Sequence, residues 1–270
     1  MTPQELYRDR KVWSHSFGHR PLVMPWQVKP YRRETLSANV NFYTADREAK
    51  TLIIGFCGRG NRLFLPVGAI LQTLDYKRLD LLTVWDPRNV QYDQGVQGYA
   101  LSLPQLADRL STFAEAKQYS RVVTYGISNG GLVGLRMGQL MKADRAISAG
   151  GRFSWNIGRM LQGRPYAQSF DLLCHCRQDS TVESYALFSE SDADDAEDAR
   201  RLEAVFPACT IVPIQSDEHN FPQEMHKARR LDEYHRQLFD LDRKPDAEVL
   251  KGLVRKRSRF DPRRTFYFDI

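Results

Sequence analysis

A serine between two glycines is the residue of this sequence whose setting most strongly suggests chemistry. Residues 126–130 read Gly-Ile-Ser-Asn-Gly; they follow the short apolar run 121–125 and precede a helical pattern. A strand, a sharp turn and a helix would hold Ser128 at the apex of a strained turn that only small flanking residues tolerate. Its hydroxyl would then stand clear of the sheet for attack on a carbonyl carbon. The alternative is a glycine-rich connection that only packs tightly.

A serine hydroxyl is a weak nucleophile at neutral pH, so Ser128 needs a histidine base and an acid that orients the histidine. Asp192 follows the apolar run 185–188, and His219 follows the last apolar run, 211–214. Because parallel strands bring their carboxyl ends to one edge of a sheet, we expect Ser128, Asp192 and His219 to converge there. Among the six histidines, only His219 is expected in the loop just after the last strand; the others are His15, His19, His175, His226 and His235.

The choice of acid stays open among neighbours in the sequence. Glu190, Asp194 and Asp195 lie close to Asp192. Acids in a first helical turn are common because they complement the helix dipole, and Asp192 could serve only as a helix N-cap. We favour Asp192 as the acid and keep the other acids as alternatives.

Alternating patterns along the chain predict the elements that position these residues. Apolar runs predict strands at 38–44, 51–56, 79–85, 121–125, 145–149, 183–189 and 209–214. Amphipathic patterns predict helices at 65–75, 104–117, 130–141, 194–206 and 222–240. Repeated alternation of strand and helix indicates a doubly wound α/β fold with a mostly parallel sheet of about seven or eight strands.

The chain divides into three parts on this pattern. We expect an irregular arm at 1–37, one α/β domain at 38–240 and a basic tail at 241–270. Within the domain, the aromatic-rich stretch 151–181 is either a small cap over a pocket or an ordinary crossover between strands. We expect the basic tail to be solvated or to pack back through its aromatic residues; an anionic surface or a nucleic acid is the alternative partner, although no nucleic-acid-binding motif accompanies it.

The serine turn and the order serine, acid, histidine resemble the α/β-hydrolase family over residues 38–240. The resemblance implies that Ser128 is the nucleophile, that His219 is the general base and acid, and that Asp192 orients the imidazole. It also implies an oxyanion hole formed by the backbone N–H groups of Asn129 and Arg59.

The early loop departs from the family pattern. It reads Phe-Cys-Gly-Arg-Gly at 56–60, so Cys57 stands where family members commonly carry histidine. We interpret Cys57 as a small buried filler rather than a second nucleophile. The loop is also a poor dinucleotide-binding turn, because Leu63 occupies the place of the third glycine.

The resemblance implies a serine hydrolase that acts on a carboxylic ester or thioester through an acyl-serine intermediate, or that transfers the acyl group. It implies no cofactor and no metal. We expect a small-molecule or glycan-linked acyl ester as substrate, and Arg59, Arg152 and Arg159 could favour an anionic or sugar-linked one. The rival hypothesis is a catalytically inactive protein of the same fold that binds or scaffolds partners through its basic tail.

The composition of the chain argues against several other classes of protein. The chain has 270 residues, a net charge of +6 and 42% hydrophobic residues, and its apolar runs are too short to span a bilayer. Residues 1–10 lack the apolar stretch of a signal peptide, so we expect a cytoplasmic protein. Four cysteines imply no disulfide framework. Cys174 and Cys176 flank a histidine, which fits half of a zinc site or, as we favour, the alternation of a half-buried strand.

Overall fold

The computed structural model describes residues 31–254 apart from 46–48, 177 and 180. Residues 1–30 and 255–270 lie outside the described residues, and with them most of the expected arm and the more basic half of the expected tail. Within the described part, no helix is long and apolar enough to cross a membrane.

The described chain forms one eight-stranded sheet with the strand order β1-β2-β4-β3-β5-β6-β7-β8. The pairings β1 with β2 and β2 with β4 are antiparallel, and all the others are parallel. The predicted fold class, a mostly parallel sheet of about seven or eight strands, is therefore confirmed. The strands are β1 (Arg32–Ser37), β2 (Val40–Thr44), β3 (Thr51–Phe56), β4 (Leu79–Val84), β5 (Arg121–Ile127), β6 (Arg145–Ala149), β7 (Glu183–Ser189) and β8 (Thr210–Ile214).

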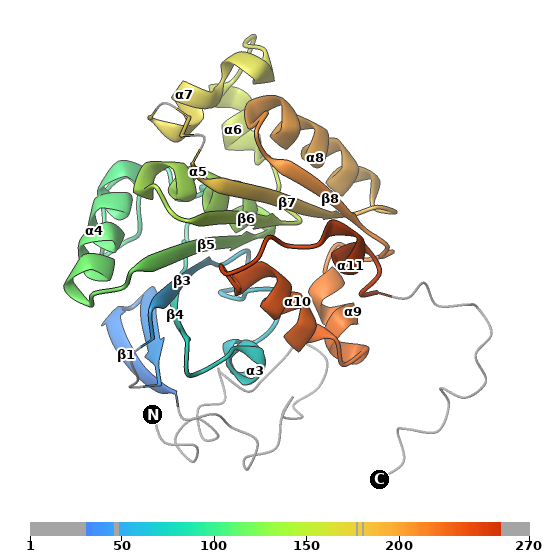
Figure 1. Ribbon diagram of the computed structural model, residues 1–270. Helices are drawn as coiled ribbons and strands as arrows, with labels where there is room; N and C mark the ends of the chain where they lie inside the picture. The colour runs from blue at the N-terminus through green and yellow to red at the C-terminus, as the bar shows by residue number, and fades with distance from the viewer. Residues whose placement is uncertain (1–30, 46–48, 177, 180, 255–270) are drawn as a thin grey trace, which may run out of the picture.

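Helices cover both faces of the sheet (Figure 1). On one face α3, α9, α10 and α11 build a core with alternate strand residues such as Ile53, and on the other face α4 and α5 pack on its neighbours Leu52 and Ile54. Successive strand side chains point to opposite faces, so a strand buried on both sides reads as a continuous apolar run. The helices are α3 (Val67–Thr73), α4 (Leu103–Ala116), α5 (Gly131–Met141), α6 (Trp155–Met160), α7 (Phe170–Cys174), α8 (Ala193–Val205), α9 (Phe221–Lys227), α10 (Leu231–Phe239) and α11 (Ala247–Lys251).

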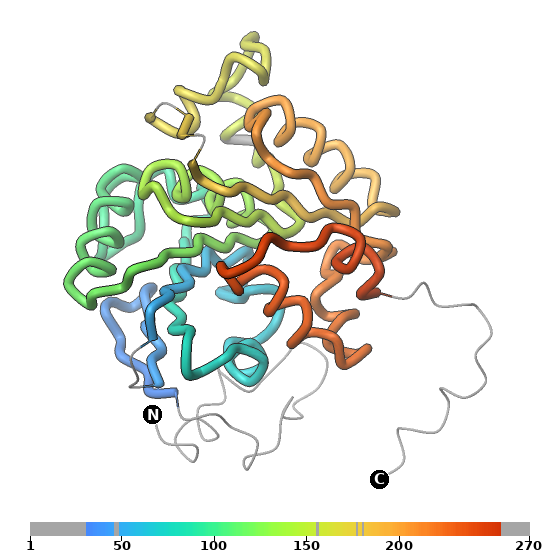
Figure 2. Tube along the Cα trace, in the orientation of Figure 1, coloured from blue at the N-terminus to red at the C-terminus, as the bar shows by residue number. Residues whose placement is uncertain are grey.

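The stretch 151–181 is the crossover from β6 to β7 and carries α6 and α7. Its apolar residues share a core with α5 and α8. In Figure 2 this stretch, coloured yellow, lies beside α8. Cys174 ends α7 in that core, and His175 follows it in a left-handed conformation with φ of 55°. The half-buried strand that we favoured for Cys174 and Cys176 is thus wrong, because the segment is the end of a short helix.

The folded domain extends beyond both of its expected ends. β1 pairs with β2 although its residues are largely exposed, so the sheet begins before residue 38. At the other end, Leu250 of α11 and Leu253 just after it are buried in the core, so the domain continues past residue 240.

The single helix expected at 222–240 is two helices, α9 and α10. Arg229 adopts a φ of 56°, and the N–H of Arg230 donates to the carbonyl oxygen of Met225 at 2.8 Å. A residue in the left-handed region followed by this bond is the geometry of a Schellman cap, which ends a helix. Arginine gives no sequence signal for such a cap.

Candidate active site

The turn after β5 has the strained geometry that the glycine spacing predicts. Ser128 opens a 3₁₀ turn, Ser128–Gly130, between β5 and α5, and its φ is 49°. A Cβ on Gly126 would collide with the carbonyl oxygen of Gly130, and a Cβ on Gly130 would collide with that of Phe56. The strand, the turn and the helix can come this close only with glycine at both positions, which holds Ser128 at the apex.

His219 joins the serine to an acid through its two ring nitrogens. Its Nε2 lies 3.1 Å from Oγ of Ser128, and its Nδ1 lies 2.7 Å from Oδ1 of Asp195. The serine lies 91 positions from the histidine along the chain, and the acid lies 24 positions from it. The parallel strands bring the three residues together at one edge of the sheet, as expected for residues that follow strand ends.

The acid in contact with His219 is Asp195 and not the predicted Asp192. Asp195 is buried in the first turn of α8, and its Oδ2 accepts a hydrogen bond of 3.3 Å from the backbone N–H of Ser189. Asp192 instead caps α8, since its Oδ1 accepts from the N–H of Asp195 at 3.0 Å. The N-cap alternative therefore describes Asp192, because a capping side chain turns back toward the helix N–H groups.

The histidine ring is fixed by its neighbours. Phe64 meets it edge-on, with ring centroids 5.2 Å apart and an interplanar angle of 81°. Gly150, whose φ is 57°, lies so close that a Cβ there would be 2.8 Å from the Cε1 atom of His219. With the ring held, Nδ1–H can donate to Asp195 while Nε2 accepts the hydroxyl proton of Ser128, which is the tautomer that activates a serine.

The loop after β3 lies against the serine turn. A Cβ on Gly58 would lie 3.2 Å from the Cβ of Ser128, so this backbone runs beside the nucleophile. The Tyr92 hydroxyl lies 3.0 Å from the carbonyl oxygen of Cys57 and 2.8 Å from that of Val84, which ties the loop to β4. Burial raises the pKa of the Cys57 thiol to about 12, so it stays protonated at neutral pH.

The two predicted oxyanion donors lie in these two segments, Arg59 in the loop after β3 and Asn129 in the serine turn. Asn129 is in the first turn after the nucleophile, where helical N–H groups have no preceding carbonyl to bond, and its side-chain Nδ2 donates to Oδ1 of Asn89 at 2.7 Å. Arg59 follows Gly58 and has an exposed side chain. The oxyanion hole of Asn129 and Arg59 stays a prediction.

The side chain of Arg152 forms ion pairs with aspartates. Its guanidinium lies 2.8 Å from Asp195, 3.6 Å from Asp192 and 3.5 Å from Asp194. The idea that Arg152 attracts an anionic substrate is therefore not favoured, since these carboxylates already balance its charge. Arg159 lies on the exposed side of α6.

One group of acidic and histidine side chains in the described ranges has the spacing of a metal site. Its members are Asp192, Asp195 and His219, whose ligand atoms lie within 4.8 Å of one another. The Arg152 guanidinium contacts this same group, with a nitrogen 3.2 Å from Nδ1 of His219. A cation bound there would be repelled by the arginine charge at close range, so the cluster suits the arginine better than a metal ion.

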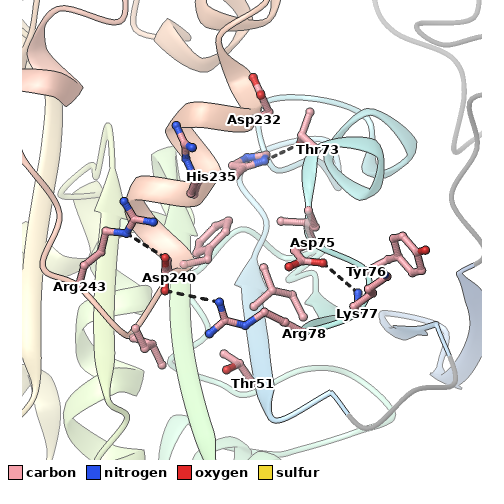
Figure 3. A pocket seen from close by; sticks show the side chains of 15 residues that line it. Thr51, Thr73, Asp75, Tyr76, Lys77, Arg78, Asp232, His235, Asp240 and Arg243 are labelled. Atoms are coloured by element: carbon pink, nitrogen blue, oxygen red, sulfur yellow. Dashed lines mark hydrogen bonds and ion pairs between the residues drawn. The ribbon is translucent and has the colours of Figure 1, made fainter.

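A cavity of about 610 Å³ lies at the opposite edge of the sheet (Figure 3). It is lined by Thr51 and Leu79, which begin β3 and β4, whereas Ser128 follows the carboxyl end of β5. Figure 3 shows Arg78 and Arg243 directed toward Asp240 in this cavity, at 3.9 and 2.9 Å. Asp240 thus pairs with both arginines, and the cavity is separate from the candidate triad.

Comparison with known proteins supports the fold. No protein-family model and no curated protein matches the sequence. The structure is similar to a dienelactone hydrolase from Anabaena variabilis, with a TM-score of 0.50 and 16% identity over 78% of this chain and 99% of that chain. Lower TM-scores relate it to a serine hydrolase without a lid from Xanthomonas campestris (0.46; 13% identity; 77% and 94% covered) and to Est1E from Butyrivibrio proteoclasticus (0.48; 13% identity; 78% and 99% covered).

With the strand order and the turn after β5, the likeness to the dienelactone hydrolase shows that this chain has the α/β-hydrolase fold.

Proposed function

We propose that this protein is a serine hydrolase that cleaves a carboxylic ester or thioester through an acyl-serine intermediate. The observation that carries the proposal is the continuous contact from Oγ of Ser128 through the His219 ring to a buried carboxylate, that of Asp195. Nucleophile, base and acid in mutual hydrogen-bond contact are the arrangement that activates a serine hydroxyl.

The chemistry follows from these atoms. Nε2 of His219 takes the hydroxyl proton as Oγ of Ser128 bonds to the carbonyl carbon, and Asp195 stabilises the imidazolium that forms. The backbone N–H groups of Asn129 and Arg59 would hold the oxyanion. The tetrahedral intermediate expels an alkoxide or thiolate, which takes the proton from Nε2 and leaves an acyl-serine.

Transfer of the acyl group from Ser128 to an acceptor completes the cycle. Water enters, gives a proton to Nε2 of His219 and attacks the acyl carbon. The bond from the acyl carbon to Oγ of Ser128 then breaks, Oγ takes the proton back from Nε2, and the acid is released. Another hydroxyl in place of water would make the reaction an acyl transfer. The side chain of His219 is 26% exposed, so an acceptor can reach the base from solvent. A small-molecule or glycan-linked acyl ester remains the proposed substrate class.

The experiment that tests the proposal is intact-mass spectrometry after incubation with a fluorophosphonate probe. We expect one adduct on the native protein, mapped by peptide analysis to Ser128, and none on Ser128→Ala. His219→Ala should react more slowly by a factor on the order of 10³ or more, because the serine loses its base. Ser102→Ala is the matched control, since Ser102 only caps α4 and should leave labelling unchanged.

The labelling result separates hydrolysis from scaffolding. A folded native protein that forms no adduct would overturn the proposal and favour the inactive scaffold. Where Ser128 is labelled, a series of p-nitrophenyl esters and acyl thioesters of increasing chain length identifies the acyl group by kcat/KM.

A further inference from the structure

Resting on the proposed function, we propose that Arg152 is a positioning residue that fixes Asp195, and through it the tautomer of His219. The residue belongs to no element; it follows β6 at the start of the crossover to β7. Its side chain is 22% exposed, so its charge is partly shielded from water.

The main chain of Arg152 is anchored on the nucleophile turn. Its N–H donates to the carbonyl oxygen of Ser128 at 3.1 Å, and its own carbonyl accepts from Nε2 of Gln91 at 2.6 Å. Gln91 is buried, and its Oε1 accepts the hydroxyl of Ser154 at 2.9 Å. These main-chain bonds hold the Cα of Arg152 in place relative to Ser128, independently of the contacts of its side chain.

The side chain of Arg152 connects that anchor to the acid. A guanidinium nitrogen lies 2.8 Å from Oδ1 of Asp195, the same oxygen that lies 2.7 Å from Nδ1 of His219. The other oxygen of the carboxylate accepts from Ser189. With the two oxygens held from different elements, the plane of the carboxylate is fixed, and a charge-assisted bond from arginine is among the stronger ones available.

The distances among Arg152, Asp195 and His219 indicate which group donates to which. Nδ1 of His219 is closer to Asp195, at 2.7 Å, than to the Arg152 nitrogen, at 3.2 Å. When Nδ1 carries a proton, arginine and imidazole are both donors to the same carboxylate oxygen and do not bond to each other. If Asp195 turned away, Nδ1 could instead accept from Arg152; the ring proton would then sit on Nε2, which could no longer take the proton of Ser128.

Asp192 and Asp194, which also lie near the Arg152 guanidinium, do not substitute for its bond to Asp195. Asp192 is 3.6 Å from the guanidinium and already caps α8, and the side chain of Asp194 is 86% exposed. Solvent screens a pair with an exposed acid, so such a pair contributes little. The bond between Arg152 and the buried Asp195 is therefore the one that we expect to matter for reactivity.

A double-mutant cycle on the rate of fluorophosphonate labelling tests the proposal. Arg152→Gln should label Ser128 more slowly by a factor on the order of 10 to 100, because small misplacement of a reacting group has costs of this size. In an Asp195→Asn background the same change should have almost no further effect, because Arg152 would then have no carboxylate to hold. Guanidinium ion, but not sodium ion, should partly restore labelling of Arg152→Ala.

The control is Arg200→Gln on α8, which removes an exposed arginine that pairs with Glu197 at 3.1 Å and touches no triad residue. It should label at the native rate. Thermal unfolding of each variant identifies loss of fold, and Arg152→Lys keeps the charge without the planar fork, with an intermediate rate expected.

A second readout does not depend on activity. The downfield NMR signal of the Nδ1 proton of His219, assigned by its absence from His219→Gln, should be sharp in the native protein and in Arg200→Gln and be lost or broadened in Arg152→Gln.

An unchanged signal in Arg152→Gln, a native labelling rate in that variant, or an equal loss in both backgrounds of the cycle would each overturn the role of Arg152. Failure of the native protein to label at all would count against the proposed function instead, and the NMR comparison would still decide whether Arg152 positions the ring.

Discussion

The carboxylate of Asp195 lies 2.7 Å from the imidazole Nδ1 of His219, although a neighbouring aspartate, Asp192, caps the same helix. The two acids belong to the same first turn of α8 but have different partners, the histidine for Asp195 and a helix N–H group for Asp192. This division of roles leads to the first prediction.

Asp195→Asn should lower the labelling rate of Ser128 by a factor on the order of 10³ to 10⁴, because an amide no longer fixes the reactive tautomer of His219. Asp192→Ala should instead destabilise the fold by about 1 kcal/mol through loss of the N-cap. Labelling kinetics together with urea denaturation measure both effects. A larger kinetic loss in Asp192→Ala than in Asp195→Asn would identify Asp192 as the acid after all.

Gly150→Ala should disable the site by displacing the histidine. A methyl group there would lie 2.8 Å from Cε1 and 3.1 Å from Nδ1 of His219, so the ring would have to move away from Ser128. Gly163→Ala is the matched control, because Gly163 also has a positive φ, 75°, but no atom lies within 4 Å of the added methyl. Both variants should lose about 1 kcal/mol of stability, and only Gly150→Ala should label slowly. Equal labelling of the two variants would count against the tight fit.

The cysteines should differ in their reaction with iodoacetamide at pH 8. Burial raises the pKa of Cys57 and of Cys209 to about 12, and it also raises that of Cys174. Since the thiolate is the reactive form, these thiols should resist alkylation in the folded protein, and half-buried Cys176 should be modified first. Peptide mapping before and after unfolding measures this order. Rapid alkylation of Cys57 in the folded state would reopen its role as a second nucleophile.

Arg145→Met should be among the more destabilising single changes in the chain. The buried guanidinium donates to the carbonyl oxygens of Leu238 and Arg243, at 2.9 and 2.8 Å, and it pairs with Glu183 at 2.8 Å. Removing it leaves these partners unsatisfied, at a cost of about 3–5 kcal/mol.

The matched control for Arg145 is Arg121→Met. Arg121 makes an ion pair of similar length, 2.8 Å, with an exposed acid, Asp242. Its removal should lower the free energy of unfolding far less than Arg145→Met does, because solvent screens the pair. Urea denaturation of both variants gives the comparison, and similar midpoints would show that the bonds made by Arg145 contribute little net stability.

The fold could be predicted from the sequence because its signals are local and repeated. Strands buried on both faces must be continuously apolar, and the predicted ranges 51–56, 145–149 and 183–189 coincide with β3, β6 and β7. β1 was missed because the edge of the sheet leaves its side chains largely exposed, so Arg32–Ser37 lacks an apolar pattern. The break between α9 and α10 was missed because packing, not residue type, places Arg229 in a left-handed conformation.

The sequence by itself determined that Ser128 stands in a tight turn with glycine on both sides. The requirement for Gly126 comes from the same segment, through the carbonyl oxygen of Gly130, whereas the requirement for Gly130 comes from the carbonyl oxygen of Phe56 in β3. It also determined the order in which serine, acid and histidine follow strands, after β5, β7 and β8. Only the tertiary structure decided that Asp195 meets His219 and that Arg152 joins them, because Asp192, Asp194 and Asp195 are chemically alike. The direction in which the first turn of α8 leaves the sheet selects among them, and that direction is set by packing against distant residues.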